Sequence, residues 1–135
     1  MRILILVLSL LMLPAATAAE YAVVVASNST IGALDSARLR DIFLRHRNFE
    51  GEVRLVPVNL LGEDSTRTHF ETSVLNMNRD ELNRYWITGH FQGLKPPATQ
   101  ASLQSVKAFI AHVEGAIGYL PLAMVDDSLK VIHEF

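Results

Sequence analysis

Ser65, Thr66 and Arg67 are consecutive side chains that together suit the binding of a small anion. They follow Asp64, a residue type that often precedes the first turn of a helix. A helix N-terminus carries unpaired N–H groups and a partial positive charge, so it attracts anions. Two hydroxyl groups and a guanidinium add donors that match phosphate or carboxylate. A simpler alternative stays open: Asp64 and Ser65 only cap the helix, and Arg67 is solvated.

A second polar cluster, Ser27–Thr30, follows the apolar run Tyr21–Ala26. Ligands of open α/β sheets bind beyond the carboxyl ends of the strands. Ser27, Ser29 and Thr30 are therefore further candidate ligand-binding residues, together with the Asn59–Ser65 segment after the next predicted strand.

The sequence offers little for metal binding or catalysis. Its five histidines form no His-x-x-x-His pair, and the lack of cysteine excludes thiol chemistry and cysteine-based zinc sites. No Gly-x-Ser-x-Gly, P-loop or Gly-x-Gly-x-x-Gly motif occurs. The spacing of Ser29, Asp64 and His69 supports no triad, although His69 could border the anion site. We therefore expect no metal, no cofactor and a binding protein rather than an enzyme.

Strands and helices alternate in the pattern of hydrophobicity. Tyr21–Ala26 is continuously apolar, which is typical of a strand covered on both faces. Asp35 caps a helix with the buried stripe Leu39, Ile42 and Phe43. Val53–Asn59 is the second predicted strand, in which Pro57 indicates an edge or a strand end.

The remaining segments continue this alternation. Helices are predicted after Asp64, after the capping box at Asn78 and after Ser102, with a loop over Gly89–Ala98. Ala116–Leu120 and Leu129–Phe135 are the last predicted strands. Alternation predicts an α/β fold: a mainly parallel sheet with helices on both faces, in one domain.

The first nineteen residues have the composition of a secretory signal. Arg2 precedes the apolar run Ile3–Leu13, and Ala16-Thr17-Ala18 gives a small-residue cleavage site. Eleven residues are too few to cross a bilayer, which needs about 17 to 25. We expect residues 1–19 to be removed, and residues 20–135 to form one periplasmic domain without stable membrane insertion.

The charge of the chain excludes two classes of partner. The formal net charge is −2, and loss of Arg2 with the signal makes it more negative. A chain without a basic excess holds neither a nucleic-acid backbone nor an anionic membrane through its overall charge.

Several segments of the chain resemble one known family as a set. Leu34–Leu44 is similar to a "sLtleeLrdIFlG" segment, Val56–Asn59 and Glu63–Phe70 to a strand and "GSGTR…F" turn, and Glu114–Leu120 to "PGAIGYv". Together they resemble phosphate-type periplasmic binding proteins of ABC transporters, in which such segments occur in the same order. Tyr85-Trp86 and Phe91–Pro97 resemble the short, stand-alone members of that family.

The resemblance implies one lobe of a two-lobed clamshell, the lobe that carries the anion-binding turn. The family's Gly-Ser-Gly-Thr-Arg turn falls on Glu63, Asp64, Ser65, Thr66 and Arg67. Thr66 and Arg67 match, Asp64 stands in place of the hydroxyl donor, and Glu63 and Ser65 replace glycines. The two carboxylates would repel phosphate unless it carries a proton that a carboxylate can accept.

Two functions are compatible with these residues. The resemblance implies an exported solute-binding-like protein that recognises a small oxyanion, either phosphate or a phosphorylated ligand, and works with an ABC permease. The alternative is a non-transport periplasmic interaction or sensory module with a degenerate pocket and an envelope protein as partner. Asp64 and the missing glycines favour the alternative.

Overall fold

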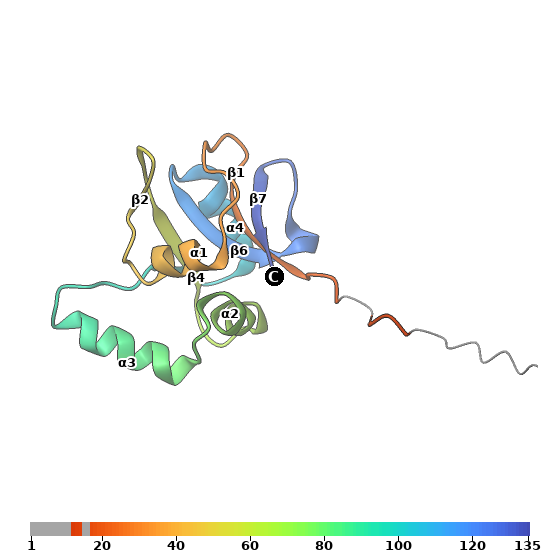
Figure 1. Ribbon diagram of the computed structural model, residues 1–135. Helices are drawn as coiled ribbons and strands as arrows, with labels where there is room; N and C mark the ends of the chain where they lie inside the picture. Colours follow the sequence, from red (N-terminus) through yellow and green to blue (C-terminus); the bar gives the residue numbers. More distant parts are fainter. Residues whose placement is uncertain (1–11, 15–16) are drawn as a thin grey trace, which may run out of the picture.

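The computed structural model describes residues 12–14 and 17–135, and Figure 1 shows a central sheet with helices around it. The sheet has five strands in the order β5-β4-β6-β1-β7, and β2 and β3 form a separate hairpin. The strands are β1 (Tyr21–Ala26), β2 (Phe49–Glu50), β3 (Val53–Arg54), β4 (Val56–Leu60), β5 (Ala98–Gln100), β6 (Ala116–Pro121) and β7 (Leu129–Glu134). The helices are α1 (Ser36–Phe43), α2 (Ser65–Phe70), α3 (Arg79–His90) and α4 (Leu103–His112), with a π-helical turn η1 (Glu71–Leu75) and a 3₁₀ turn η2 (Leu122–Met124).

The sheet is mainly parallel, as predicted, except for one strand. β4 runs parallel to both β5 and β6, whereas β1 pairs antiparallel with β6 and with β7. Four strands therefore run in one direction, and β1 runs opposite to them. The apolar run of β1 is buried as expected, but an apolar run does not reveal the direction of a strand.

Helices cover both faces of the sheet, which confirms the predicted α/β layering. On one face the Tyr119 ring of β6 stacks on Phe70 of α2 at 4.1 Å between centroids, and Phe43 of α1 meets Phe70 edge-on at 4.7 Å. On the other face α4 packs closely, because a Cβ atom added at Gly118 would lie 2.7 Å from the Ile110 side chain. The core thus lies on both sides of β6.

The predicted helix caps are present. Asp35 accepts the Arg38 N–H at 2.8 Å, Asn78 accepts the Glu81 N–H at 2.9 Å, and Ser102 accepts the Ser105 N–H at 3.1 Å. The predicted stripe of α1 (Leu39, Ile42 and Phe43) is buried.

The second predicted strand differs from expectation. Its first residues pair in the β2–β3 hairpin, and β4 lies between β5 and β6, so the edge position inferred from Pro57 is wrong. Pro57 is tolerated because the pairing of β4 with β5 begins only at Val58. The predicted Gly89–Ala98 loop is shorter, since Gly89 and His90 belong to α3 and Ala98 begins β5.

Most of the expected signal segment, residues 1–19, lies outside the described residues. Among the residues that are described, every helix is too short or too polar to cross a membrane.

Candidate functional site

The turn between β4 and α2 places the predicted anion-binding residues at the carboxyl end of a parallel strand. Asp64 caps α2, and its carboxylate accepts the Thr66 N–H at 2.8 Å. Ser65 is exposed, whereas Thr66 is buried. The carboxylate of Asp64 thus takes a helix N–H group that an external anion would need.

Arg67 is engaged with other parts of the protein. Its Nη1 donates to the Leu60 carbonyl at 2.9 Å, and its Nε donates to Glu71 at 3.3 Å. Only 17% of its side chain is exposed. The guanidinium therefore turns back onto the end of β4 and into the protein.

Glu71 is the centre of this arrangement. Its side chain is 5% exposed, and Arg79 donates to its other oxygen at 2.7 Å and 3.0 Å. Arg79 also reaches the Gly62 carbonyl at 3.3 Å. One buried carboxylate is therefore held by two guanidinium groups, which satisfies the requirement that a buried charge be paired and hydrogen-bonded. We call Arg67, Glu71 and Arg79 the Glu71 triad.

A cavity of about 310 Å³ opens beside the Glu71 triad. It is lined by Glu63, Thr68, Glu71, Thr72, Met77, Asn78 and Arg79. Glu63 and Glu71 bring negative charge to this cavity, which disfavours a polyanion there.

Glu71 and Arg79 were missed by sequence reasoning. Arg67 and Glu71 are four residues apart on a predicted helix, and this spacing could have indicated that they form an ion pair. The π-helical turn that begins at Glu71 gives no such signal, and it sets where the carboxylate points.

The Tyr119 side chain holds the end of β4 through two hydrogen bonds. Its hydroxyl accepts the buried Leu60 N–H at 3.2 Å and donates to Asn59 at 3.0 Å. Burial raises the pKa of the Tyr119 phenol well above its usual value. Tyr119 therefore fills the core and also fixes the backbone of Leu60, whose carbonyl accepts a hydrogen bond from Arg67.

Removing this hydroxyl with Tyr119→Phe is expected to lower the free energy of unfolding by about 1 to 2 kcal/mol, because it leaves the Leu60 N–H without an acceptor. Urea denaturation measures this effect.

Wild-type stability should also fall above pH 10, where the unfolded chain ionises the phenol and the folded chain keeps its proton. This part of the pH dependence should be missing from Tyr119→Phe, and an unchanged alkaline profile would contradict the assignment.

The polar cluster after β1 (Ser27, Ser29 and Thr30) lies at the other end of the strands from the β4–α2 turn. The reason is the direction of β1, whose start pairs with the end of β6 at Tyr21↔Pro121. The end of β1 thus lies near the start of β6, and β4 also begins there, at Val56↔Ala116. The inference that these three residues join Ser65, Thr66 and Arg67 in one site is therefore wrong. Ser29 and Thr30 line a cavity of about 320 Å³, and Ser27 lines another of about 490 Å³.

His69 takes part in an aromatic cluster rather than in an anion site. Its ring lies 4.8 Å from the ring of Tyr21 and 5.7 Å, stacked, from that of Phe135. Across the described part of the chain, His, Asp and Glu side chains form no group of three that could hold a metal ion.

Comparison with known proteins shows the fold but not a family. No family model matches the sequence, and no curated protein matches it. A phosphate ABC transporter substrate-binding protein of Clostridium perfringens, solved with bound phosphate, is 19% identical with a TM-score of 0.68. An ABC-type phosphate transport receptor of Vibrio cholerae is 18% identical with a TM-score of 0.67, and PstS of Borrelia burgdorferi is 11% identical with a TM-score of 0.65.

Each of these matches covers 84% of the present chain but only 44 to 46% of the solved one. The chain therefore spans less than half the length of the structures it matches. The predicted resemblance to one lobe of a phosphate-type binding protein is confirmed at the level of the fold.

Proposed function

We propose that this protein is an exported, solute-binding-like module of the bacterial periplasm that acts through contacts with another envelope protein. The main observation in support is the Glu71 triad, in which Arg67, the arginine expected to bind an oxyanion, pairs with the internal carboxylate of Glu71 instead. The lobe keeps the solute-binding fold, and its anion-binding turn is filled by the protein's own acidic side chains.

Two further features support this proposal. The Asp64 carboxylate binds an N–H group in the first turn of α2, and Glu63 is exposed beside Asp64. Both carboxylates repel a polyanion at the β4–α2 turn, and this repulsion acts in addition to the engagement of Arg67 by Leu60 and Glu71. The proteins with similar folds are binding proteins, which agrees with a function in recognition rather than in catalysis.

A second candidate is recognition of a small oxyanion at the β4–α2 turn, in cooperation with an ABC permease. One observation favours it: the Glu71 triad contains two guanidinium groups against one carboxylate, and Ser65 is exposed at the start of α2. A protonated phosphate could replace Glu71 between the arginines and donate its proton to Asp64. Ser65, Thr66 and Arg67 would be the ligand-binding residues in this case.

Calorimetric titration of residues 20–135 with phosphate, sulfate and a phosphorylated sugar, at pH 6 and pH 8, separates the two candidates. We expect no saturable heat at either pH, because Arg67 and the first turn of α2 are already engaged. Saturable heat that strengthens at pH 6 and is lost in Arg67→Ala would contradict our proposal and establish the second candidate.

Arg47→Ala is the matched control for that titration, since Arg47 pairs with Glu50 on the β2–β3 hairpin, outside the Glu71 triad. Far-ultraviolet circular dichroism of each variant confirms that it folds. An Arg67→Ala variant that folds and still binds phosphate like the wild type would place the anion elsewhere.

A further inference from the structure

Helix α3 is the most peripheral helix of the fold. Figure 1 shows it beside α2 and away from the sheet, with its C-terminal end pointing outward. Its inner face carries the buried Leu82 and Gly89 and the half-buried Tyr85, whose hydroxyl donates to the Leu44 carbonyl at 2.6 Å. These contacts fix the rotation of α3 on the body and therefore fix which residues point outward.

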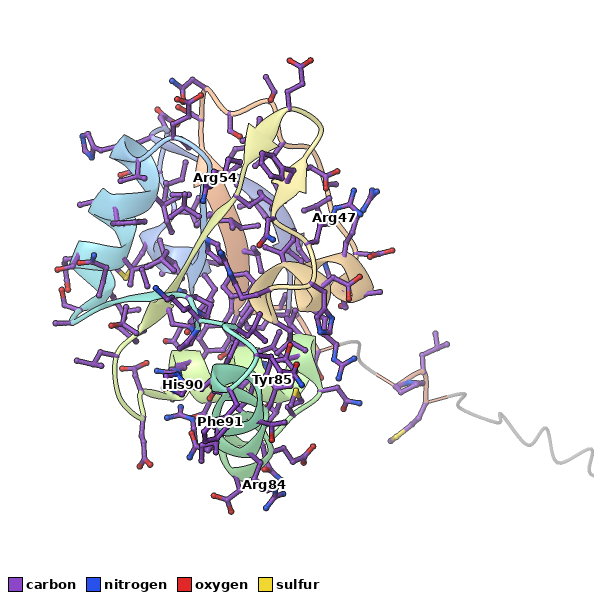
Figure 2. The ribbon with its side chains drawn as sticks, turned by 90° about the vertical axis from the view of Figure 1, so that its left-hand side faces the viewer. Arg47, Arg54, Arg84, Tyr85, His90 and Phe91 are labelled. Carbon is purple, nitrogen blue, oxygen red and sulfur yellow. The ribbon has the colours of Figure 1, made fainter. Side chains whose placement is uncertain are left out.

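The outer face of α3 presents one stripe, Asp80, Arg84, Ile87 and Phe91, at the spacing i, i+4, i+7 and i+11 of a single helix face. Ile87 is 64% exposed and Phe91 is 85% exposed. In Figure 2, Arg84 lies on the side of α3 away from the sheet, Tyr85 lies toward the sheet, and Phe91 lies at the end of α3 that faces the viewer. We call these four residues the α3 stripe.

The order of residues along the α3 stripe matters for its partner. The acidic residue lies at the N-terminal end of the helix, the cation follows it, and the two apolar residues lie toward the C-terminal end. No carboxylate occurs anywhere from Leu82 to Val113, although the chain as a whole is acidic. The segment that contains Ile87 and Phe91 therefore carries the cations Arg84 and Lys95 and no carboxylate.

We propose that the α3 stripe is the contact surface between two copies of this chain, packed antiparallel about a two-fold axis. A two-fold interface uses the same patch on both copies, so the patch must complement itself when reversed. With the axis between Ile87 and Thr88, Arg84 of each copy lies level with Phe91 of the partner copy. Each guanidinium then meets an aromatic face, and the two Ile87 side chains meet at the centre.

The same register keeps like charges apart. The two Arg84 residues lie about 10 Å from each other along the helix axis, and the two Asp80 residues about 22 Å. A parallel arrangement would instead put Arg84 beside Arg84 and Asp80 beside Asp80, which is repulsive. The acidic N-terminal turn of α3, with Asp80 and Glu81, disfavours an anionic membrane as the occupant of this stripe.

Single cysteine variants test this arrangement cleanly, because the natural sequence contains no cysteine. Packed helices lie about 8 to 10 Å apart, so Ile87→Cys places two thiols beside the axis within reach of a disulfide. Under mild oxidation we expect Ile87→Cys of the mature chain to form a covalent dimer. Glu81→Cys on the same helix should not, because its two copies lie about 20 Å apart along the axis.

Leu61→Cys is the matched control for exposure, since Leu61 is 58% exposed in the loop after β4.

Sedimentation equilibrium of the cysteine-free chain gives the second readout. Phe91→Ser should weaken self-association about tenfold, and Phe49→Ser, on the β2–β3 hairpin, should leave it unchanged. Equal cross-linking of all three cysteine variants, or a wild-type chain that stays monomeric up to millimolar concentration, would overturn the proposal. These results do not depend on phosphate binding, so they are independent of the titration above.

Discussion

Substitution of Glu71 by glutamine is expected to lower the free energy of unfolding by about 3 kcal/mol. Glutamine keeps the size of the side chain but removes the charge that pairs Arg67 and Arg79. Both guanidinium groups are largely withdrawn from water, with side-chain exposures of 17% and 29%, so solvent replaces the lost partner only in part. Urea denaturation of the wild type and of Glu71→Gln measures the difference.

Glu50→Gln is the control for this substitution. Glu50 also contacts two arginines, Arg38 and Arg47, but its side chain is more exposed, as are those of its partners. We expect its removal to cost less than about 1 kcal/mol. Equal losses in the two variants would mean that the Glu71 triad has no special electrostatic role.

The same Glu71→Gln variant also links stability to the proposed function. With the internal carboxylate neutralised, Arg67 and Arg79 are left as an unoccupied cationic pair beside the cavity at Glu63 and Asn78. Sulfate should therefore raise the melting temperature of Glu71→Gln more than it raises that of the wild type or of Glu50→Gln. An identical sulfate response in all three would show that Glu71 does not take the place of an external anion.

Substitution of Gly115 by alanine is the second change with a large expected effect. Gly115 has φ +77°, and a Cβ atom there would collide with the Arg54 carbonyl oxygen. Neither backbone moves easily, because the Gly115 carbonyl accepts the Val56 N–H at 2.8 Å. We expect a loss of more than about 3 kcal/mol, from left-handed strain and a backbone collision together.

Gly51→Ala separates these two contributions. Gly51 also has a positive φ, +60°, but open space surrounds its Cβ position. Its substitution should cost only the strain, about 1 to 2 kcal/mol. If thermal denaturation shows equal losses in Gly51→Ala and Gly115→Ala, the close approach of Gly115 to Arg54 is not a real constraint.

The helices and most strands could be predicted from the sequence because their signals are local. Asp35, Asn78 and Ser102 cap helices through contacts within three residues, and the apolar stripe of α1 follows the helical period. Such signals are independent of the rest of the chain. The element pattern, and with it the α/β class, follows from them.

The arrangement of the site could not be predicted in the same way. Whether Ser29 lies near Arg67 depends on the direction of β1, and that direction is decided by pairing with β6 and β7 far along the chain. The engagement of Arg67 depends on Glu71 and Arg79 meeting across a π-helical turn. The residue types of the turn are visible in the sequence, but which donors remain available is a tertiary property.

The central position of β1 has a consequence for how the chain folds. Its partners in β6 and β7 lie more than ninety positions later, from Val24↔Gly118 to Ala26↔Leu129. The middle of the sheet therefore cannot close until the strands β6 and β7 are available to pair with β1. Such distant pairing makes folding slow, because the entropy of closing a long loop is lost before the strand contacts form.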